Sequence, residues 1–232
     1  MTKPGPKFRR GGLHGRRKGR PLSPRRAELM ASAYPKLAID VDVSAPKNLT
    51  SLFQDEPARL CLEIGFGGGE HLIASAAGDP TSGFIGVEPF VNGMAKAVVA
   101  VVDGGLHNIR LFGGEASLFL DWLPTASLDE VDLLYPDPWP KKRHWKRRFI
   151  SDENVARLAR VLKPGAVFRF ASDIPSYVEW TLAHLLKRSD FVWTAERAED
   201  WVMPFPGWPG TRYEAKAIAA GRTPTYLAFK RA

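Results

Sequence analysis

Short apolar runs alternate with longer amphipathic stretches along this chain from about residue 58 onward. Seven of the apolar runs have the length and composition of strands: 59–64, 83–88, 109–112, 129–135, 166–171, 190–195 and 223–229. Helical stretches fit between them at 69–77, 90–103, 115–121, 151–162 and 174–187. The alternation predicts a doubly wound, Rossmann-like α/β fold, with a mostly parallel seven-stranded sheet and helices on both faces. The sequence before the seventh run is poor in helix signals, so we expect an antiparallel last strand.

The helix over 151–162 has a start and a stop in the sequence. Ser151 precedes two acidic residues, a pattern typical of a helix N-cap. After the last apolar position comes Lys163-Pro164-Gly165, and a glycine in this place predicts that the helix closes there.

Before residue 58 the hydrophobic periodicity is lost. Residues 1–26 contain ten Lys/Arg and no acid, so we expect a basic tail that is disordered unless bound. Residues 27–57 form a lead-in with a short helix over 27–34, and 58–232 form the folded domain. No apolar run approaches about 18 residues and no apolar segment lies near the start. We therefore expect no transmembrane helix, no signal peptide and a cytoplasmic location.

Basic charge is concentrated in two segments. The net charge is +8, yet the 206 residues after the tail carry 23 basic and 25 acidic side chains. Six of those basic residues lie in 141–148, so the rest of the body is acidic. Two basic segments on an acidic body favour a phosphate-backbone partner such as RNA. A tail that only aids solubility is the alternative.

A glycine-rich turn follows the first predicted strand, in the sequence EIGFGGGE that begins at Glu63 and ends at Glu70. Glycines between a strand and a helix let a ligand approach the backbone closely. A nicotinamide-dinucleotide loop would need glycine in place of Glu70, whose carboxylate would repel a pyrophosphate. The spacing E-x-G-x-G-x-G therefore argues against an NAD-linked oxidoreductase.

Further acids follow the next four predicted strands: Glu88, Glu115, Asp137 and Asp173. The carboxyl ends of parallel strands line one crevice, and carboxylates there suit a ligand with positive charge and hydroxyls. Glu88 lies 19 residues beyond Gly69, about where such folds place a ribose-binding acid. S-adenosylmethionine, with its sulfonium, ammonium and ribose, matches this set. Glu115 also fits a plain helix-start acid.

The fourth predicted strand runs into YPDPWP at 135–140, followed by the basic segment KKRHWKRR at 141–148. Prolines fix φ and lack an N–H, so a stiff loop is predicted. A rigid acidic tip beside a basic arm suits chemistry on one group of a polyanion, and guanine in RNA is the leading candidate. Trp139 and Trp145 are expected either to stack on bases or to pack against the domain. An Asx-type turn is the alternative role of Asp137.

Together these motifs resemble the bacterial tRNA (guanine-N7-)-methyltransferases of the TrmB type. The resemblance covers about 58–229 and rests on LEIGFGGGEH, GVEPF, YPDPWPKKRHWKRRF, ASD at 171–173 and GTRYE at 210–214. It implies the class I S-adenosylmethionine-dependent methyltransferase fold. It also implies transfer of a methyl group from S-adenosylmethionine to N7 of guanine 46 in the tRNA variable loop.

The resemblance also assigns residues. Positions that contact the methyl donor match Glu63, Glu88, Glu115 and Asp137, to which the glycine loop adds Gly65, Gly67 and Gly69. Positions for the tRNA substrate match Lys141, Asp173, Thr211, Arg212, Tyr213 and Glu214. The RNA-contacting arm matches Arg143, His144, Trp145, Lys146, Arg147 and Arg148. The family pattern often has Asp at position 115, so Glu115 keeps the charge and changes the reach.

We expect Asp137 to be the catalytic side chain, because it can accept a hydrogen bond from guanine and stabilise the developing positive charge. Guanine N7 carries a free lone pair, so positioning can supply most of the rate enhancement. The alternatives are a non-catalytic RNA-binding protein on the same fold and a methyltransferase for another RNA or a small molecule. The five histidines show no metal-ligand spacing, so no metal is expected. Monomer and homodimer both stay open.

Overall fold

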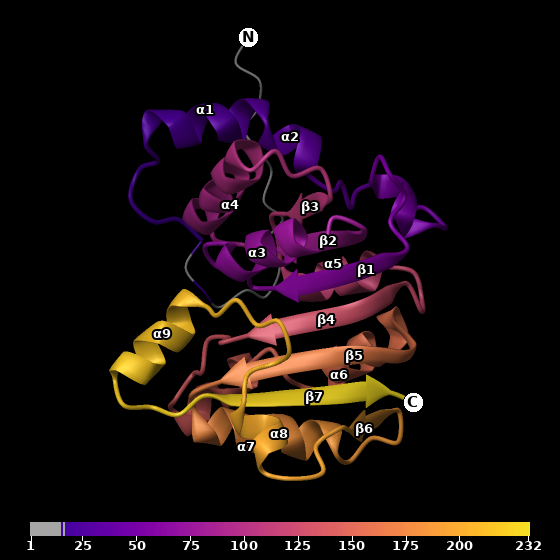
Figure 1. Ribbon diagram of the computed structural model, residues 1–232, viewed down its shortest axis with the longest axis vertical. Helices are drawn as coiled ribbons and strands as arrows, with labels where there is room; N and C mark the ends of the chain where they lie inside the picture. Colours follow the sequence, from indigo (N-terminus) through magenta and orange to yellow (C-terminus); the bar gives the residue numbers. More distant parts are fainter. Residues whose placement is uncertain (1–14, 16) are drawn as a thin grey trace. The chain divides into compact units, whose positions relative to one another are not determined.

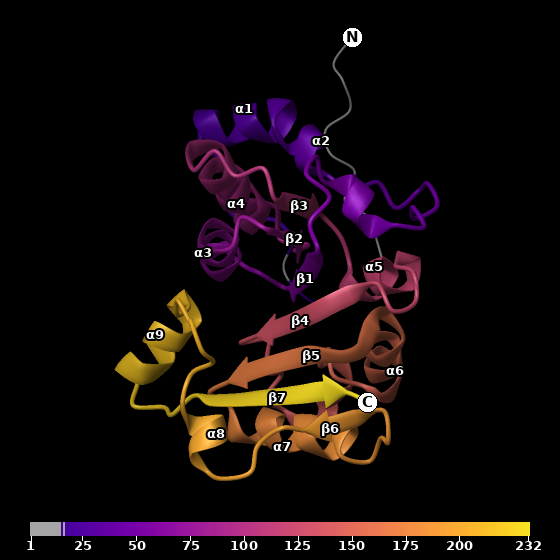
Figure 2. The ribbon, with the colours of Figure 1, turned by 45° about the vertical axis from the view of Figure 1, so that its right-hand side comes forward.

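The computed structural model describes residue 15 and residues 17–232. The chain forms two compact units, Met1–Leu123 and Pro124–Ala232, each of which is described here by itself. Figures 1 and 2 show the elements of both units. The predicted domain over 58–232 therefore contains parts of two units.

The described part of the first unit has a three-stranded parallel arrangement in the order β3-β2-β1. Its elements are α1 (Pro24–Ser32), α2 (Tyr34–Leu37), the 3-10 helix η1 (Leu49–Leu52), β1 (Arg59–Ile64), α3 (Glu70–Gly78), β2 (Ser82–Val87), α4 (Val91–Asp103), β3 (Ile109–Phe112) and α5 (Ala116–Trp122). The strands are nearly continuous apolar runs and almost fully buried, as expected for parallel strands covered by helices.

The carboxyl ends of these three strands lie level with one another. Ile64 of β1 pairs with Val87 of β2, which in turn pairs with Phe112 of β3. The chain therefore leaves all three strands at one edge of the sheet, and the predicted acids and glycines of this unit begin there.

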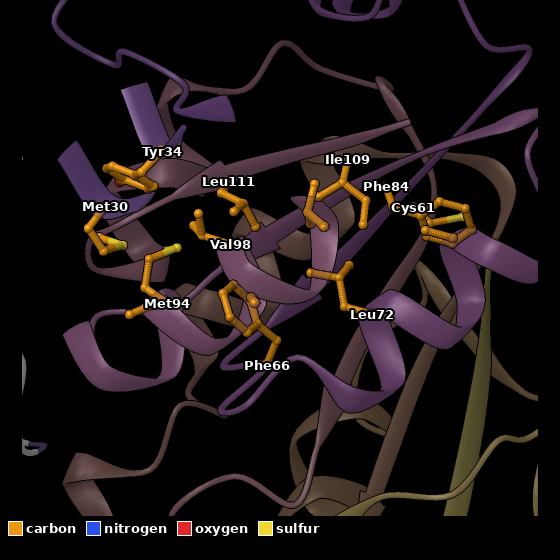
Figure 3. Packing of buried hydrophobic residues seen from close by; sticks show 14 residues of the cluster. Met30, Tyr34, Cys61, Phe66, Leu72, Phe84, Met94, Val98, Ile109 and Leu111 are labelled. Atoms are coloured by element: carbon orange, nitrogen blue, oxygen red, sulfur yellow. The ribbon is translucent and has the colours of Figure 1, made fainter. Parts of the chain in front are cut away.

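The hydrophobic core of the first unit joins its N-terminal helices to the sheet. Met30 of α1 and Tyr34 of α2 are buried in the same cluster as Met94 and Val98 of α4 and Leu111 of β3 (Figure 3). Burial of the Tyr34 hydroxyl raises its pKa to about 12. The predicted lead-in is thus an integral part of this unit.

The described end of the predicted tail is attached to α4. The amide of Val91 donates a hydrogen bond to the carbonyl of Arg17 at 2.9 Å. The Asn92 side chain accepts from the amide of Gly19 at 2.6 Å and donates to the carbonyl of Arg20 at 2.7 Å. The helix expected from residue 27 begins earlier, at Pro24. Residues 1–14 and 16 of the predicted tail lie outside the described residues.

The second unit contains four strands in the order β4-β5-β7-β6. Its elements are β4 (Leu128–Leu134), the 3-10 helix η2 (Lys142–Arg147), α6 (Asp152–Val161), β5 (Leu162–Ser172), α7 (Pro175–Leu185), β6 (Phe191–Trp193), α8 (Glu199–Val202), α9 (Arg212–Ala219) and β7 (Thr225–Arg231). Strands β4 and β5 are parallel, and β7 is antiparallel to both β5 and β6. The predicted antiparallel last strand is confirmed, and with it the predicted α/β fold class.

The boundary between α6 and β5 differs from the prediction. Ser151 caps α6 as expected, accepting a hydrogen bond from the amide of Asn154 at 3.3 Å. The helix ends at Val161 and β5 begins at the next residue, so the prediction that Gly165 closes the helix was wrong. Gly165 has φ +82° and lies where the β4–β5 register shifts. The Lys-Pro-Gly sequence therefore forms an irregularity inside the strand, which a proline without an N–H and a left-handed glycine both favour.

Two helices were missed between the sixth and seventh strands, α8 and α9. α9 begins with a capping box, in which Thr211 accepts from the amide of Glu214 and the Glu214 side chain accepts from the amide of Thr211. No helix within residues 17–232 is long and apolar enough to cross a membrane.

Candidate functional site

The glycine loop after β1 has the backbone conformation that only glycine adopts without strain. Gly65, Gly67 and Gly69 have φ of +73°, +58° and +83°. The Gly65 amide donates to the carbonyl of Val87 at 2.7 Å, which fixes the start of the loop to the end of β2. A Cβ placed on Gly65 would meet nothing within 4 Å. The backbone at Gly65 is exposed, and the close approach of a ligand there stays a prediction.

The other side of the loop lies against α4. A Cβ on Gly93, in the first turn of α4, would approach the carbonyl oxygen of Gly67 to 2.0 Å. A Cβ on Gly69 would lie 3.0 Å from that of Ala97. Gly93 therefore lies directly against the loop, a contact that the sequence analysis missed. Its glycine type next to GVEPF was the available hint, but the contact itself depends on how α4 packs.

Glu88 joins the glycine loop to the start of α4. Its carboxylate accepts hydrogen bonds from the amide of Gly67 at 2.7 Å and from the amide of Phe90 at 2.8 Å. The side chain is 6% exposed. The structure thus brings Glu88 and the loop together, as the sequence spacing predicted. The bonds fix the direction of the carboxylate before any ligand binds.

Glu63, at the end of β1, has a buried partner that the sequence analysis missed. Nδ1 of His71 lies 2.9 Å from Oε2 of Glu63, and both side chains are buried. His71 is the second residue of α3, directly after the glycine loop. Its position eight residues beyond Glu63, across a strand–loop–helix turn, was the only available hint.

Glu115 stands at the N-cap position of α5, and its carboxylate accepts a hydrogen bond from the Ser117 hydroxyl at 2.8 Å. The position fits a helix-start acid. It also lies three residues beyond β3, at the same sheet edge as Glu88. Its contact with a methyl donor stays a prediction.

In the second unit, the loop after β4 is strained around an exposed carboxylate. Tyr135 and Trp139 have φ of +48° and +43°, in a region that bulky residues seldom occupy. Asp137 lies midway between them and is exposed. Strain of this kind persists only where surrounding contacts impose it, and it is concentrated at functional sites. The structure therefore agrees with the predicted stiff loop and presents Asp137 to solvent.

The basic arm, residues 141–148, is mostly the short helix η2. Its exposed side chains are Lys141, Lys142, Arg143 and Lys146. The Arg147 guanidinium lies 5.0 Å from the centre of the Trp139 ring, which also meets the His144 ring edge-on. Loss of hydration and the neighbouring cations, Arg147 first among them, lower the pKa of His144 below its ordinary value of 6.5. The surroundings therefore disfavour protonation of His144 in the free protein.

Trp145 packs edge-on against Trp180 of α7, with ring centroids 5.6 Å apart. Of the two uses that the sequence left open for this residue, packing against the domain is the one observed. Arg148 is also buried, at 3% exposure. The sequence predicted an RNA contact for it, whereas the structure turns its guanidinium inward.

The predicted substrate residues beyond the arm divide into paired and exposed groups. Asp173, one residue after β5, accepts a hydrogen bond from Arg222 Nε at 2.5 Å. The Glu214 carboxylate accepts from Trp208 Nε1 at 2.7 Å and from the Tyr226 hydroxyl. Tyr213 is 45% exposed. Sequence reasoning missed Arg222 as a partner of Asp173.

The hydroxyls around Glu214 are hard to ionise. Burial first, and then the Glu214 hydrogen bond, raise the pKa of Tyr226. Burial and the neighbouring Tyr226 hydroxyl raise the pKa of Tyr135. Both phenols therefore stay protonated at physiological pH, and the Tyr226 hydroxyl donates to Glu214. Glu214 therefore has a structural role in tying α9 to β7, and its substrate contact stays a prediction.

Similarity to known proteins decides the family. The model of a family described as "Putative methyltransferase" matches residues 57–227. The tRNA (guanine-N(7)-)-methyltransferase of Rhizobium meliloti (strain 1021) is 58% identical over 218 residues, which cover 94% of each chain. The chain belongs to the tRNA (guanine-N7-)-methyltransferase family. The enzyme of that name from Brucella melitensis biotype 1 is 54% identical over 95% of each chain.

Solved structures share the fold of this family member. The 16S rRNA methyltransferase KamB is 18% identical, with a TM-score of 0.60 over 82% of this chain and 95% of that one. TrmN from Thermus thermophilus has a TM-score of 0.54 at 16% identity, over 88% of this chain and 53% of that one. At such identities the likeness concerns the fold alone. In the described part of this tRNA (guanine-N7-)-methyltransferase family member, no three His, Cys, Asp or Glu gather as metal ligands.

Proposed function

We propose that the protein methylates N7 of guanine 46 in the variable loop of tRNA, using S-adenosylmethionine and giving N7-methylguanosine. The curated relatives at 54–58% identity carry the name tRNA (guanine-N(7)-)-methyltransferase, which supports the reaction class. The observation that carries the proposal for this chain is the loop after β4. Its strained backbone presents exposed Asp137 directly before an arm of exposed cations.

Residues of the first unit would bind S-adenosylmethionine. The open backbone at Gly65 admits close approach of a ligand, and the Glu88 carboxylate, which the amides of Gly67 and Phe90 hold in place, would accept from ribose hydroxyls. Glu63 adds a second carboxylate at the same edge, which favours a cationic ligand. When bound, S-adenosylmethionine supplies a sulfonium-activated methyl group and leaves as a neutral thioether.

Residues of the second unit would hold the guanine. Asp137 accepts hydrogen bonds from the guanine N1–H or exocyclic amine, which aligns N7 for attack and stabilises the positive charge that spreads over the ring. No base is needed, because the N7 lone pair is free and methyl transfer itself releases no proton. Holding the reacting atoms in line can contribute roughly 7–11 kcal/mol in favourable cases. Adenine presents a different donor pattern, with no N1–H, which gives a route to selectivity.

The exposed cations of the arm would bind the phosphate backbone and fix the register of the tRNA. Lys141, Arg143 and Lys146 are solvent-exposed and so available for such contacts. Each phosphate contact steepens the salt dependence of binding, so tRNA affinity should fall sharply with ionic strength.

The test combines the purified protein, labelled S-adenosylmethionine and unmodified tRNA transcripts, followed by digestion and identification of the methylated nucleoside. A transcript with adenine in place of guanine 46 is the matched control. We expect N7-methylguanosine from the first transcript and none from the second. Label in both would indicate another position, whereas bound tRNA without transfer would support a non-catalytic RNA-binding protein.

A further inference from the structure

Arg148 differs from the other cations of the basic arm in where its charge lies. It is 3% exposed, whereas Lys142, Arg143 and Lys146, on the 3-10 helix η2 that precedes it, are exposed. Its amide donates to the carbonyl of Trp145 at 2.9 Å and so ends that helix. A phosphate of bound RNA would have to enter the protein to reach this guanidinium.

The guanidinium donates three hydrogen bonds, one to the loop and two to α7. Nε donates to the carbonyl of Pro138 at 2.9 Å. Nη1 donates to the carbonyl of Ser176 at 2.7 Å, and Nη2 donates to the Ser176 hydroxyl at 3.1 Å. Because the donors of an arginine lie in one rigid plane, these bonds fix the position of the Pro138 carbonyl relative to the start of α7.

Three aromatic rings surround the same group. The Arg148 Cζ lies 4.4 Å from the centre of the Trp145 ring, 4.7 Å from that of Tyr177 and 5.6 Å from that of Trp180. Ring faces attract a cation and replace part of its lost hydration. They also leave the guanidinium little freedom to turn toward solvent.

The point that Arg148 holds lies next to Asp137. The Pro138 carbonyl belongs to the residue directly after Asp137, and the positive φ angles of Tyr135 and Trp139 lie on either side. A strained loop keeps one conformation only if outside contacts impose it. The Arg148–Pro138 hydrogen bond is such a contact, and it acts within one peptide of the predicted catalytic side chain.

We propose that Arg148 is a positioning residue for methyl transfer, which fixes Asp137 through the Pro138 carbonyl and does not contact tRNA. This inference rests on the proposed function of Asp137. Loss of the guanidinium fork should therefore lower turnover at saturating tRNA while tRNA binding keeps its strength and its salt dependence.

The experiment compares Arg148→Lys with Lys146→Ala. Arg148→Lys keeps the charge and removes the planar fork, and we expect kcat to fall on the order of 10- to 100-fold by misplacement of Asp137. The slope of log Kd against log salt should stay as in the wild type. Lys146→Ala, an exposed member of the same arm, should lower that slope by about one. The matched comparison for the slope is Arg148→Ala, which removes the charge as Lys146→Ala does and should leave the slope unchanged. A lowered slope in Arg148→Ala would overturn the proposal, as would an unchanged kcat in Arg148→Lys.

Two further measurements keep the result interpretable. In Arg148→Ala, millimolar guanidinium should restore part of kcat by filling the vacated position, which it would not do for an unfolded protein. Hydrogen exchange of the 135–149 peptide should speed up in both variants, while exchange of the glycine loop at 65–69 stays unchanged. If the wild type transfers no methyl group, the proposed function fails. Hydrogen exchange then still tests whether Arg148 holds the loop through the Pro138 carbonyl. An unaltered exchange rate in 135–149 would overturn that role.

Discussion

The glycine loop of the first unit, residues 65–69, and the proline loop of the second, residues 135–140, are held in place in opposite ways. Each places polar groups just beyond the end of a parallel strand. The glycine loop uses residues without side chains and is fixed by a carboxylate, Glu88, that accepts two backbone N–H groups. The proline loop uses stiff, bulky residues in strained conformations and is fixed by a cation, Arg148, that donates to two backbone carbonyls.

The difference suits what each loop is proposed to bind. The glycine loop brings its backbone close to a small ligand, and the charged groups around it are already hydrogen-bonded within the protein. The proline loop displays its charges to solvent, where a large polyanion can reach them. Charged side chains can thus hold a loop in place where they are buried and can contact a partner where they are exposed.

Removing the exposed carboxylate of the proline loop should have the largest effect. In Asp137→Ala and Asp137→Asn we expect kcat to fall by about 10²- to 10³-fold, the usual cost of losing one electrostatic contact to the transition state. Binding of S-adenosylmethionine, measured by calorimetry, should survive. Asp55→Ala removes another exposed loop carboxylate and serves as the control. Turnover retained in Asp137→Asn would remove this residue from the mechanism.

One added methyl group should disrupt the close contact between α4 and the glycine loop. Gly93→Ala would put a Cβ 2.0 Å from the Gly67 carbonyl oxygen, so the loop must move. We expect a loss of stability of about 1–3 kcal/mol, typical of overpacking, and at least about tenfold weaker donor binding. Gly78→Ala is the matched control, since its Cβ would meet nothing within 4 Å. Equal donor affinities in the two variants would contradict the proposed role of the contact.

The buried partner of Glu63 should have a smaller effect. His71→Ala removes the hydrogen bond at 2.9 Å and should lower the free energy of unfolding by about 1–3 kcal/mol, as for a buried acceptor that loses a donor. The KM for S-adenosylmethionine should rise more than kcat falls, and His71→Gln should recover part of the loss. Urea unfolding and steady-state kinetics measure both. The exposed His107→Ala is the control, and matching behaviour of the two alanine variants would sink the idea.

The smallest predicted effect concerns pH. Loss of hydration and nearby cations lower the pKa of His144 in the free protein, so protonation is disfavoured there. Bound phosphates neutralise those cations and raise the pKa, so tRNA binding takes up a proton and its affinity rises as pH falls. From pH 8 to roughly pH 6 we expect a gain of about two- to threefold, beyond that of His144→Ala. Filter binding at constant ionic strength measures it, and identical pH profiles of variant and wild type would exclude the effect.

Local patterns were sufficient for the strands, the glycine loop and the carboxylates beyond the strand ends. Apolar runs and glycine spacing reflect interactions between neighbours in sequence, so α/β alternation and the position of Glu88 could be predicted. The irregularity at Gly165 could not, because the same Lys-Pro-Gly ends a helix or distorts a strand depending on what pairs beside it.

The remaining site contacts could not be predicted, because they join residues that are distant in the sequence. His71 with Glu63, and Arg222 with Asp173, join different elements, and no local pattern identifies such partners. Arg148 illustrates the limit best. Within KKRHWKRR every cation looks equally exposed, and contacts with distant residues, such as the rings of Tyr177 and Trp180 in α7, determine which of them turns inward.

The attachment of residues 17–20 to α4 changes how a shortened protein should be designed. The amide of Val91 is one of the first-turn donors of α4 that no helical carbonyl can accept, and the Arg17 carbonyl accepts it. Cutting the chain at residue 26 would expose that donor and release Asn92, which directly precedes Gly93 at the contact with the glycine loop. Such a truncation would change the contacts at the start of α4, near Glu88, as well as the net charge of the protein. Replacing cations before residue 17 by glutamine would change the charge and leave this helix start intact.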